Sequence, residues 1–168
     1  MAGAAFWRRR GAVLALGSVL ATTMLQASPV LASGKIFYGS RAGMTVTVVS
    51  MSGLDTARAV IRTKHTREDA IGFCREYVQK VTPSCIREEM DVRLNDEISA
   101  NCPRGEFVDF QGNRYRFAGP SRDKDSMAKY RLISLPSGEE ADGSSASGYP
   151  TNMSLFKALC PTKAPDDG

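Results

Sequence analysis

The fold is decided by the stretch from Glu97 to Leu135, whose middle reads ISANC (98–102), PRG (103–105), EFVDF (106–110), QGN (111–113) and RYRF (114–117). Short runs of alternating side chains separated by glycine-containing gaps are typical of an antiparallel meander. Successive side chains of a strand point to opposite faces, so Phe107 is expected to share a face with Asp109, and Tyr115 with Phe117. The sequence therefore predicts an α+β fold built on an antiparallel sheet.

The residues before this meander predict two strands and one central amphipathic helix. Residues 45–51 (TVTVVSM) are rich in β-branched residues, and residues 58–64 are expected to return beside them. Thr66 and Asp69 have the spacing of a capping box, and the apolar stripe that follows continues as far as Val81. We expect Thr82-Pro83 to end this helix.

Two further regions complete the expected domain. Residues 85–96 are compatible with a helix or a strand, and an extended entry followed by a turn is favoured. Beyond the meander, residues 129–135 predict another strand. A loop over 139–148 then leads to a short C-terminal helix, capped by Thr151 or Asn152 and ended by Cys160-Pro161.

The N-terminus has the pattern of a secretory signal peptide. Three arginines at positions 8–10 precede an uncharged apolar run from Gly11 to Leu25, and Val30-Leu31-Ala32 has the small or modest residues of a cleavage site. The apolar run is shorter than the roughly 20 residues of a membrane-spanning helix, although a membrane anchor is the alternative. We therefore expect residues 1–32 to be a signal peptide and 33–44 a loosely held arm. A single α+β domain over 45–161 and a flexible tail over 162–168 follow.

Removal of this peptide changes the charge balance. Residues 1–32 contain three arginines and no acidic residue, so the mature chain keeps all 18 acidic residues and 19 of the 22 basic ones. A nearly neutral chain has no strong basic field to attract phosphates, which argues against nucleic-acid binding. No stable membrane span is expected after cleavage, and the mature protein is expected to be periplasmic or secreted.

The cysteine pattern predicts disulfides rather than a metal site. Four cysteines at positions 74, 85, 102 and 160 lie in the mature chain, and an even number in an exported protein implies disulfides. No CxxC motif occurs and the chain has one histidine, so no common zinc site can be assembled. Spacing alone allows three pairings. Cys74–Cys85 is favoured by a doubling-back at Thr82-Pro83, and Cys102–Cys160 by docking of the last helix on the sheet.

The sequence assigns no residue a catalytic role, and no cofactor is expected. A serine nucleophile centred on Ser145 would need Gly at position 147, which is Ser. His65 precedes the Thr66 cap and is interpreted as a solvated residue at a strand end. The acidic residues of the mature chain could include a carboxylate pair of the kind that cleaves glycosides, but most are expected to lie on solvated faces and turns.

One strand face is the candidate for ligand binding. Asp109 is expected beside Phe107, while Arg114 and Arg116 alternate with Tyr115. These residues could form a groove with guanidinium and aromatic groups for an acidic peptide, a polysaccharide or a lipid headgroup. The alternative is a solvated outer face over an apolar inner one.

The last third of the chain resembles a group of known proteins through the segments RYRF (114–117), DGSSASGY (142–149) and FKALCP (156–161). These segments are similar to the ending of small exported bacterial proteins without an assigned function. The resemblance implies a bacterial envelope or secreted protein and no particular activity. The strand pattern of the meander also resembles SH3-like barrels.

Together these features predict an exported, non-catalytic structural or interaction module of the bacterial envelope, whose partner is a protein or another envelope component. The alternative is a small envelope hydrolase that uses carboxylates or the 142–149 loop.

Overall fold

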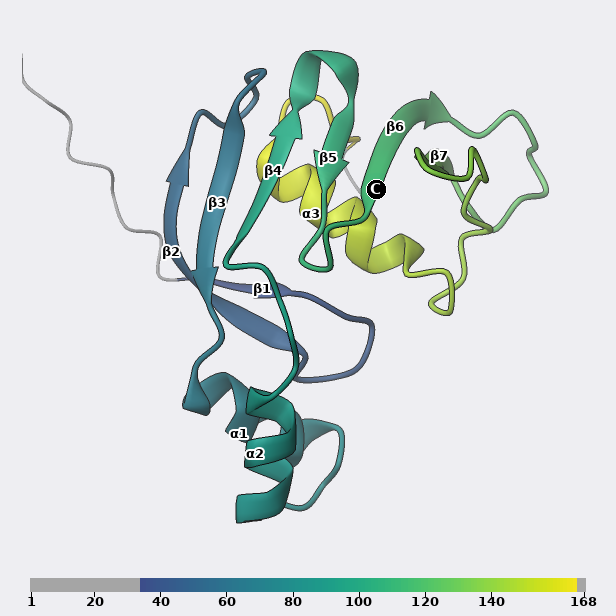
Figure 1. Ribbon diagram of the computed structural model, residues 1–168. Coiled ribbons are helices and arrows are strands. Elements are labelled where there is room, and N and C mark those ends of the chain that lie inside the picture. The colour runs from purple at the N-terminus through teal and green to yellow at the C-terminus, as the bar shows by residue number, and fades with distance from the viewer. Residues whose placement is uncertain (1–33, 166–168) are drawn as a thin grey trace, which may run out of the picture.

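The computed structural model describes residues 34–165, so the expected signal peptide over residues 1–32 lies outside the described range. Seven strands form one curled antiparallel sheet, and their spatial order follows the sequence (Figure 1). The strands are β1 (Lys35–Phe37), β2 (Thr45–Ser52), β3 (Ala59–Lys64), β4 (Glu97–Asn101), β5 (Glu106–Val108), β6 (Arg114–Pro120) and β7 (Tyr130–Ser134).

The predicted meander is confirmed as β4 to β7. Phe107 of β5 lies opposite Tyr115 of β6, and Phe117 lies opposite Leu132 of β7. The short 3-10 helix η1 (Cys102–Arg104) fills the first gap, and Gly105 after it has a left-handed backbone with φ of 68°. The sheet is larger than the meander because β1, β2 and β3 continue it on one side. The likeness to an SH3-like barrel stays an expectation.

The expectation of a loosely held arm over 33–44 is wrong for its described residues. Lys35–Phe37 pairs with β2, and the next residue, Tyr38, is 4% exposed and belongs to the main core. The three-residue strand was too short to show the alternation on which the prediction relied. Its turn depends on Gly43, which has φ of 76° and lies against the backbone of Phe73.

The main core lies between the sheet and α3 (Tyr149–Leu159). The helix crosses the sheet beside β4 and β5 (Figure 1). Leu155, Phe156 and Leu159 are fully buried, and the Phe156 ring stacks on Phe117 at a centroid distance of 4.8 Å. Burial of these large apolar side chains is the main favourable contribution to the stability of the domain.

The start of α3 corrects the prediction that Thr151 or Asn152 caps it. Gly148 is the N-cap, with φ of 71°, and Pro150 occupies the first turn. Proline is well suited there because its fixed φ is helical and its missing N–H has no helical partner in the first turn. The segment after α3 begins in an ordered conformation, because the backbone N–H and hydroxyl of Thr162 both donate to Asp55.

Two helices, rather than one, connect β3 to β4. Helix α1 (Arg67–Glu76) begins with the predicted capping box: Asp69 N–H donates to the Thr66 hydroxyl and Thr66 N–H donates to the Asp69 carboxylate. Helix α2 (Pro83–Met90) corrects the extended conformation favoured for this region. Thr82 accepts from the N–H of Cys85, so the pair interpreted as a helix stop is a cap followed by proline.

The predicted apolar stripe therefore ends early. Helix α1 stops at Glu76, and Tyr77, Val78 and Val81 are between 43% and 50% exposed. The α1–α2 hairpin projects from one end of the sheet (Figure 1). Its own buried cluster is small and consists of Ala70, Cys74 and Ile86.

Both predicted disulfides are confirmed. Cys74–Cys85 joins α1 to α2 with a Cα–Cα distance of 6.1 Å. Cys102–Cys160 joins the end of β4 to the end of α3 at 5.5 Å. Both distances lie within the usual range for a disulfide. One bridge closes the hairpin, and the other fixes α3 on the sheet.

Candidate functional site

A polar cleft of about 410 Å³ lies where four separate segments meet. They are the β1–β2 loop, the turn between β5 and β6 with the adjoining Tyr115, the end of the 142–149 loop, and the first turn of α3. The groups that line it are mainly neutral amides and hydroxyls, contributed by Ser40, Gln111, Asn113, Tyr115, Ser145, Ser147, Thr151 and Asn152. We refer to this site as the polar cleft.

Asp109 shapes one wall of the polar cleft. Asp109 is 3% exposed, and its carboxylate accepts hydrogen bonds from the N–H groups of Gln111 and Asn113, at 2.9 and 2.8 Å. The Asn113 side-chain amide adds a third, at 3.0 Å. A carboxylate that closes its own turn in this way fixes the backbone that presents Gln111 and Asn113. Asp109 is therefore a structural residue of the site.

Tyr115 of β6 also lines the polar cleft. Its ring stacks on Phe107 at 5.5 Å, and its hydroxyl is hydrogen bonded to Asn152 of α3. Burial raises the pKa of Tyr115, the charge of Asp109 raises it further, and the bond with Asn152 opposes both. The phenol is thus neutral near pH 7 and can act as a hydrogen-bonding group.

The four residues of the predicted binding face do not lie together in the structure. Asp109 and Tyr115 both line the polar cleft, but Arg114 and Arg116 are exposed and do not. Arg116 lies opposite Glu106 of β5 and Ile133 of β7 in the ladder. The alternation expected over residues 114–117 is confirmed, whereas Asp109 lies in the turn after β5 and not on a strand face beside Phe107. A ligand role for these four residues stays a prediction.

Arg41 is the cationic residue among those that line the polar cleft, and the sequence did not single it out. Its guanidinium lies over the Tyr77 ring, 4.8 Å from the centroid, so the end of α1 positions it. Gln111 is positioned by a bond from its side-chain N–H to the carbonyl of Tyr38, at 3.4 Å. These contacts join segments far apart in sequence, and no local pattern could have revealed them.

The 142–149 loop is ordered by its own hydrogen bonds. Asp142 accepts a hydrogen bond from the N–H of Ser144 at 2.8 Å. Its hydrogen bonds with Ser144, and then with Ser147, lower the pKa of Asp142. The Ser147 hydroxyl donates to the Ser144 carbonyl. Gly143 has φ of 87°, and a Cβ there would lie 2.5 Å from the backbone nitrogen of Ala128. The loop is therefore built to hold its last residues, 145–148, at the rim of the polar cleft.

His65 corrects the interpretation of a solvated strand-end residue. Its side chain is 11% exposed, and it lies against the Tyr38 ring at 5.6 Å and near Glu89, with 3.6 Å from Nε2 to Oε1. The Tyr38 hydroxyl donates to the same oxygen of Glu89. Burial, followed by this bond, raises the pKa of Tyr38. His65 is thus part of a buried polar cluster between the sheet and α2, and its contacts are not with the loop serines.

Within residues 34–165, the structure contains no group of three or more His, Cys, Asp or Glu side chains placed to hold a metal ion. In the same residues, no helix is long and apolar enough to cross a membrane. Comparisons with protein families, curated proteins and solved structures gave no match.

Proposed function

We propose that the protein is an exported, non-catalytic binding module of the bacterial envelope whose polar cleft binds a saccharide. The observation that carries this proposal is the composition of the polar cleft. Neutral amides and hydroxyls from four segments converge there, and each can donate or accept a hydrogen bond. A ligand with many hydroxyl and acetamido groups matches such a lining, and Arg41 at the edge tolerates an acidic sugar.

The same lining supports binding over hydrolysis. Acid–base hydrolysis of a glycoside needs two carboxyl groups within about 10 Å on either side of the bond. Asp109 is the only carboxylate that lines the polar cleft, and its three hydrogen bonds are internal to the turn. The alternative, a small envelope hydrolase using carboxylates or the 142–149 loop, is less well supported because the only imidazole of the chain is in another cluster.

A titration followed by NMR tests this function. The mature chain, labelled with ¹⁵N, is titrated with the trisaccharide of N-acetylglucosamine, and we expect saturable shifts at Gln111, Asn113 and residues 145–152. Ala146, exposed at the rim, is changed to Trp to fill the polar cleft, and Ala57→Trp in the exposed β2–β3 turn is the matched control. Only the first should weaken binding, by at least about tenfold.

Two results would count against the proposal. Equal weakening by both tryptophan variants would show that binding occurs elsewhere, and release of monosaccharide during the titration would support the hydrolase. Absence of any shift up to millimolar trisaccharide would reject this ligand class, because even weak specific complexes reach about millimolar affinity.

A further inference from the structure

A second hollow, of about 520 Å³ and open to solvent, borders the polar cleft. Two residues from separate segments, Tyr115 of β6 and Ser147 of the 142–149 loop, line both hollows. Because the hollows share one residue of the sheet and one of the loop, they are immediate neighbours. We refer to the second one as the acidic hollow. Its other lining residues are Leu132, Ser134, Ser137, Glu139, Glu140, Ala141 and Asp142.

The floor of the acidic hollow belongs to the face of the sheet that α3 covers. Tyr115 of β6 lies opposite Ser134 of β7 in the ladder, and Phe117 lies opposite Leu132. Phe117 stacks on Phe156 of α3, so all four strand side chains share the α3 face. The first turn of α3 also lines the polar cleft. A ligand can therefore extend from one hollow to the other along a single face of the sheet.

The far wall of the acidic hollow is the chain that follows β7. Its backbone is paired with that strand. Ser134 N–H donates to the Glu139 carbonyl at 2.8 Å, and Ala141 N–H donates to the Leu132 carbonyl at 2.9 Å. Because these hydrogen bonds hold the backbone, the wall presents its side chains from a fixed position.

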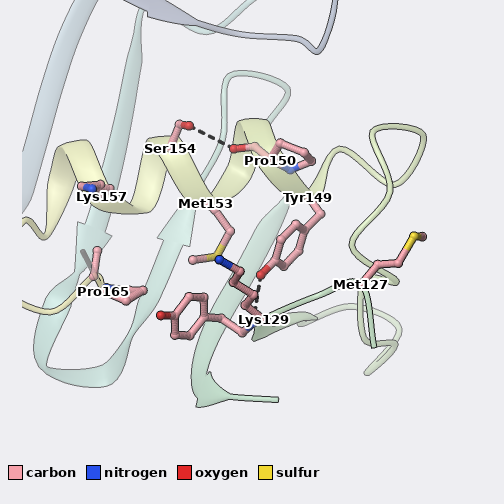
Figure 2. A pocket seen from close by; sticks show the side chains of 10 residues that line it. Met127, Lys129, Tyr149, Pro150, Met153, Ser154, Lys157 and Pro165 are labelled. Carbon is pink, nitrogen blue, oxygen red and sulfur yellow. Dashed lines mark hydrogen bonds between the residues drawn. The ribbon is translucent and has the colours of Figure 1, made fainter. Parts of the chain in front are cut away.

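The boundary between the two hollows is also held in place. The Ser147 hydroxyl donates to the Ser144 carbonyl at 2.8 Å. Two residues later, the Tyr149 hydroxyl accepts from the backbone N–H of Tyr130 at 3.0 Å, which ties the end of the loop to the segment that begins β7 (Figure 2). Both hollows are thus formed before a ligand arrives, and a preformed site loses less entropy on binding.

The acidic hollow carries negative charge. Glu140 is paired with Arg131, at 3.0 Å from Nε to Oε2. Asp142 accepts from the N–H of Ser144, and its pKa is lowered, so it is ionised near pH 7. Within residues 34–165, no lysine or arginine forms an ion pair with Glu139 or Asp142. These two carboxylates repel an acidic sugar unit and can accept hydrogen bonds from the hydroxyls of a neutral one.

We propose that the polar cleft and the acidic hollow are neighbouring subsites of one groove, which binds a neutral saccharide chain across Tyr115. This inference rests on the saccharide proposal for the polar cleft and extends it. Ser134, Ser137 and Ser147 add hydroxyls to the acidic hollow, so both subsites offer hydrogen bonds to sugar hydroxyls. Units joined in one chain reach the second subsite at a high effective concentration, so affinity rises with chain length.

Calorimetry with the disaccharide and the hexasaccharide of N-acetylglucosamine tests the extension. We expect one hexasaccharide per protein chain, with a Kd at least about tenfold below that of the disaccharide. Ser137→Trp fills the acidic hollow from an exposed position and should cancel the gain with chain length. Ser52→Trp, exposed at the end of β2 and outside both hollows, is the matched control and should keep it.

A hexasaccharide of hyaluronan tests the charge, because its units alternate between N-acetylglucosamine and glucuronic acid. We expect it to bind at least about tenfold more weakly than the neutral hexasaccharide. Glu139→Gln should narrow this difference. Glu68→Gln, exposed in α1 and outside both hollows, is the matched control and should leave it unchanged.

The possible failures are distinguishable. Equal affinity for the disaccharide and the hexasaccharide, with NMR shifts at Gln111 and Asn113 for both, would overturn the extension and leave the saccharide proposal intact. A gain with chain length that survives Ser137→Trp would also overturn it, as would hyaluronan binding as tight as that of the neutral chain. Absence of binding at every chain length would reject both proposals together.

Discussion

The core against the later turns of α3, beyond the polar cleft, is apolar, whereas the junction between the α1–α2 hairpin and the sheet buries charged and polar groups. The first region contains Phe107, Leu155 and Phe156. The second contains Asp69 and Glu89, which face Lys35 and Tyr38. Apolar burial is non-directional and strong, while a buried charge stabilises only as long as its partners remain. The comparison indicates a rigid main core and a hairpin whose attachment to the sheet depends on pH and whose own two helices depend on the Cys74–Cys85 disulfide.

The largest effect is expected in the main core. Phe156→Ala removes a fully buried ring that stacks on Phe117 and packs against Phe107, and it should lower the free energy of unfolding by about 3–5 kcal/mol. Phe73→Ala in α1 is the matched control because Phe73 is only half-buried. Urea denaturation should show that Phe73→Ala lowers the free energy of unfolding by about 1 kcal/mol or less. Equal losses would contradict the division into two regions.

Removal of each disulfide tests whether the main core and the hairpin are separately stabilised. Cys102–Cys160 spans 58 residues and Cys74–Cys85 spans 11. On the chain-entropy account, replacing each pair with alanine should cost about 4 and about 3 kcal/mol respectively. Hydrogen exchange should show a further difference: loss of the hairpin bridge exposes amides of α1 and α2 alone, and loss of the other exposes the sheet and α3. Global exchange in both variants would contradict this.

How far the sequence predicts this molecule depends on how local the determining contacts are. The β4–β7 meander, the Thr66 capping box and the Cys74–Cys85 disulfide were predicted because alternation, cap spacing and chain reversal are local signals. The Cys102–Cys160 disulfide, which spans 58 residues, was predicted from the expected docking of the last helix on the sheet. The Thr82-Pro83 pair was misread because a helix stop and a helix start share the same residues. The burial of His65 and the placement of Arg41 depend on tertiary contacts with Tyr38 and Tyr77, which no local pattern encodes.

The attachment of the hairpin should be sensitive to acid through Asp69. This fully buried carboxylate meets Lys35 at 3.0 Å and accepts from Thr47 and Thr66. Burial by itself raises its pKa, but the hydrogen bonds from Thr66, Lys35 and Thr47 outweigh it and lower the pKa. A lowered folded-state pKa contributes stability that is present above the unfolded value, near 3.9, and is lost as the pH falls through the folded value.

Asp69→Asn tests this dependence. At pH 7 the change should cost about 1.5–3 kcal/mol, because charge-assisted hydrogen bonds are lost. Urea denaturation between pH 2 and 7 should show that the wild-type chain loses this advantage below about pH 4, so the two stability curves converge there. Asp91→Asn, at an exposed position, is the control and should leave the curve unchanged. Parallel curves for wild type and Asp69→Asn would contradict the assignment.

The smallest effect on stability is expected at Val81, in the connection between α1 and α2. Its size distinguishes the exposed Val81 of the structure from the buried apolar stripe that the sequence predicted. If Val81 belonged to a continuous buried face, Val81→Ser would leave a cavity and a buried hydroxyl, and would cost 2 kcal/mol or more. In the structure Val81 follows the end of α1 and is 50% exposed. The same substitution should then shift the free energy of unfolding by less than about 0.5 kcal/mol, as surface changes do. Ile86→Ser, inside the small cluster of the hairpin, is the control that should be costly. A large loss at both positions would place Val81 in a packed interior and would require α1 to extend beyond Glu76.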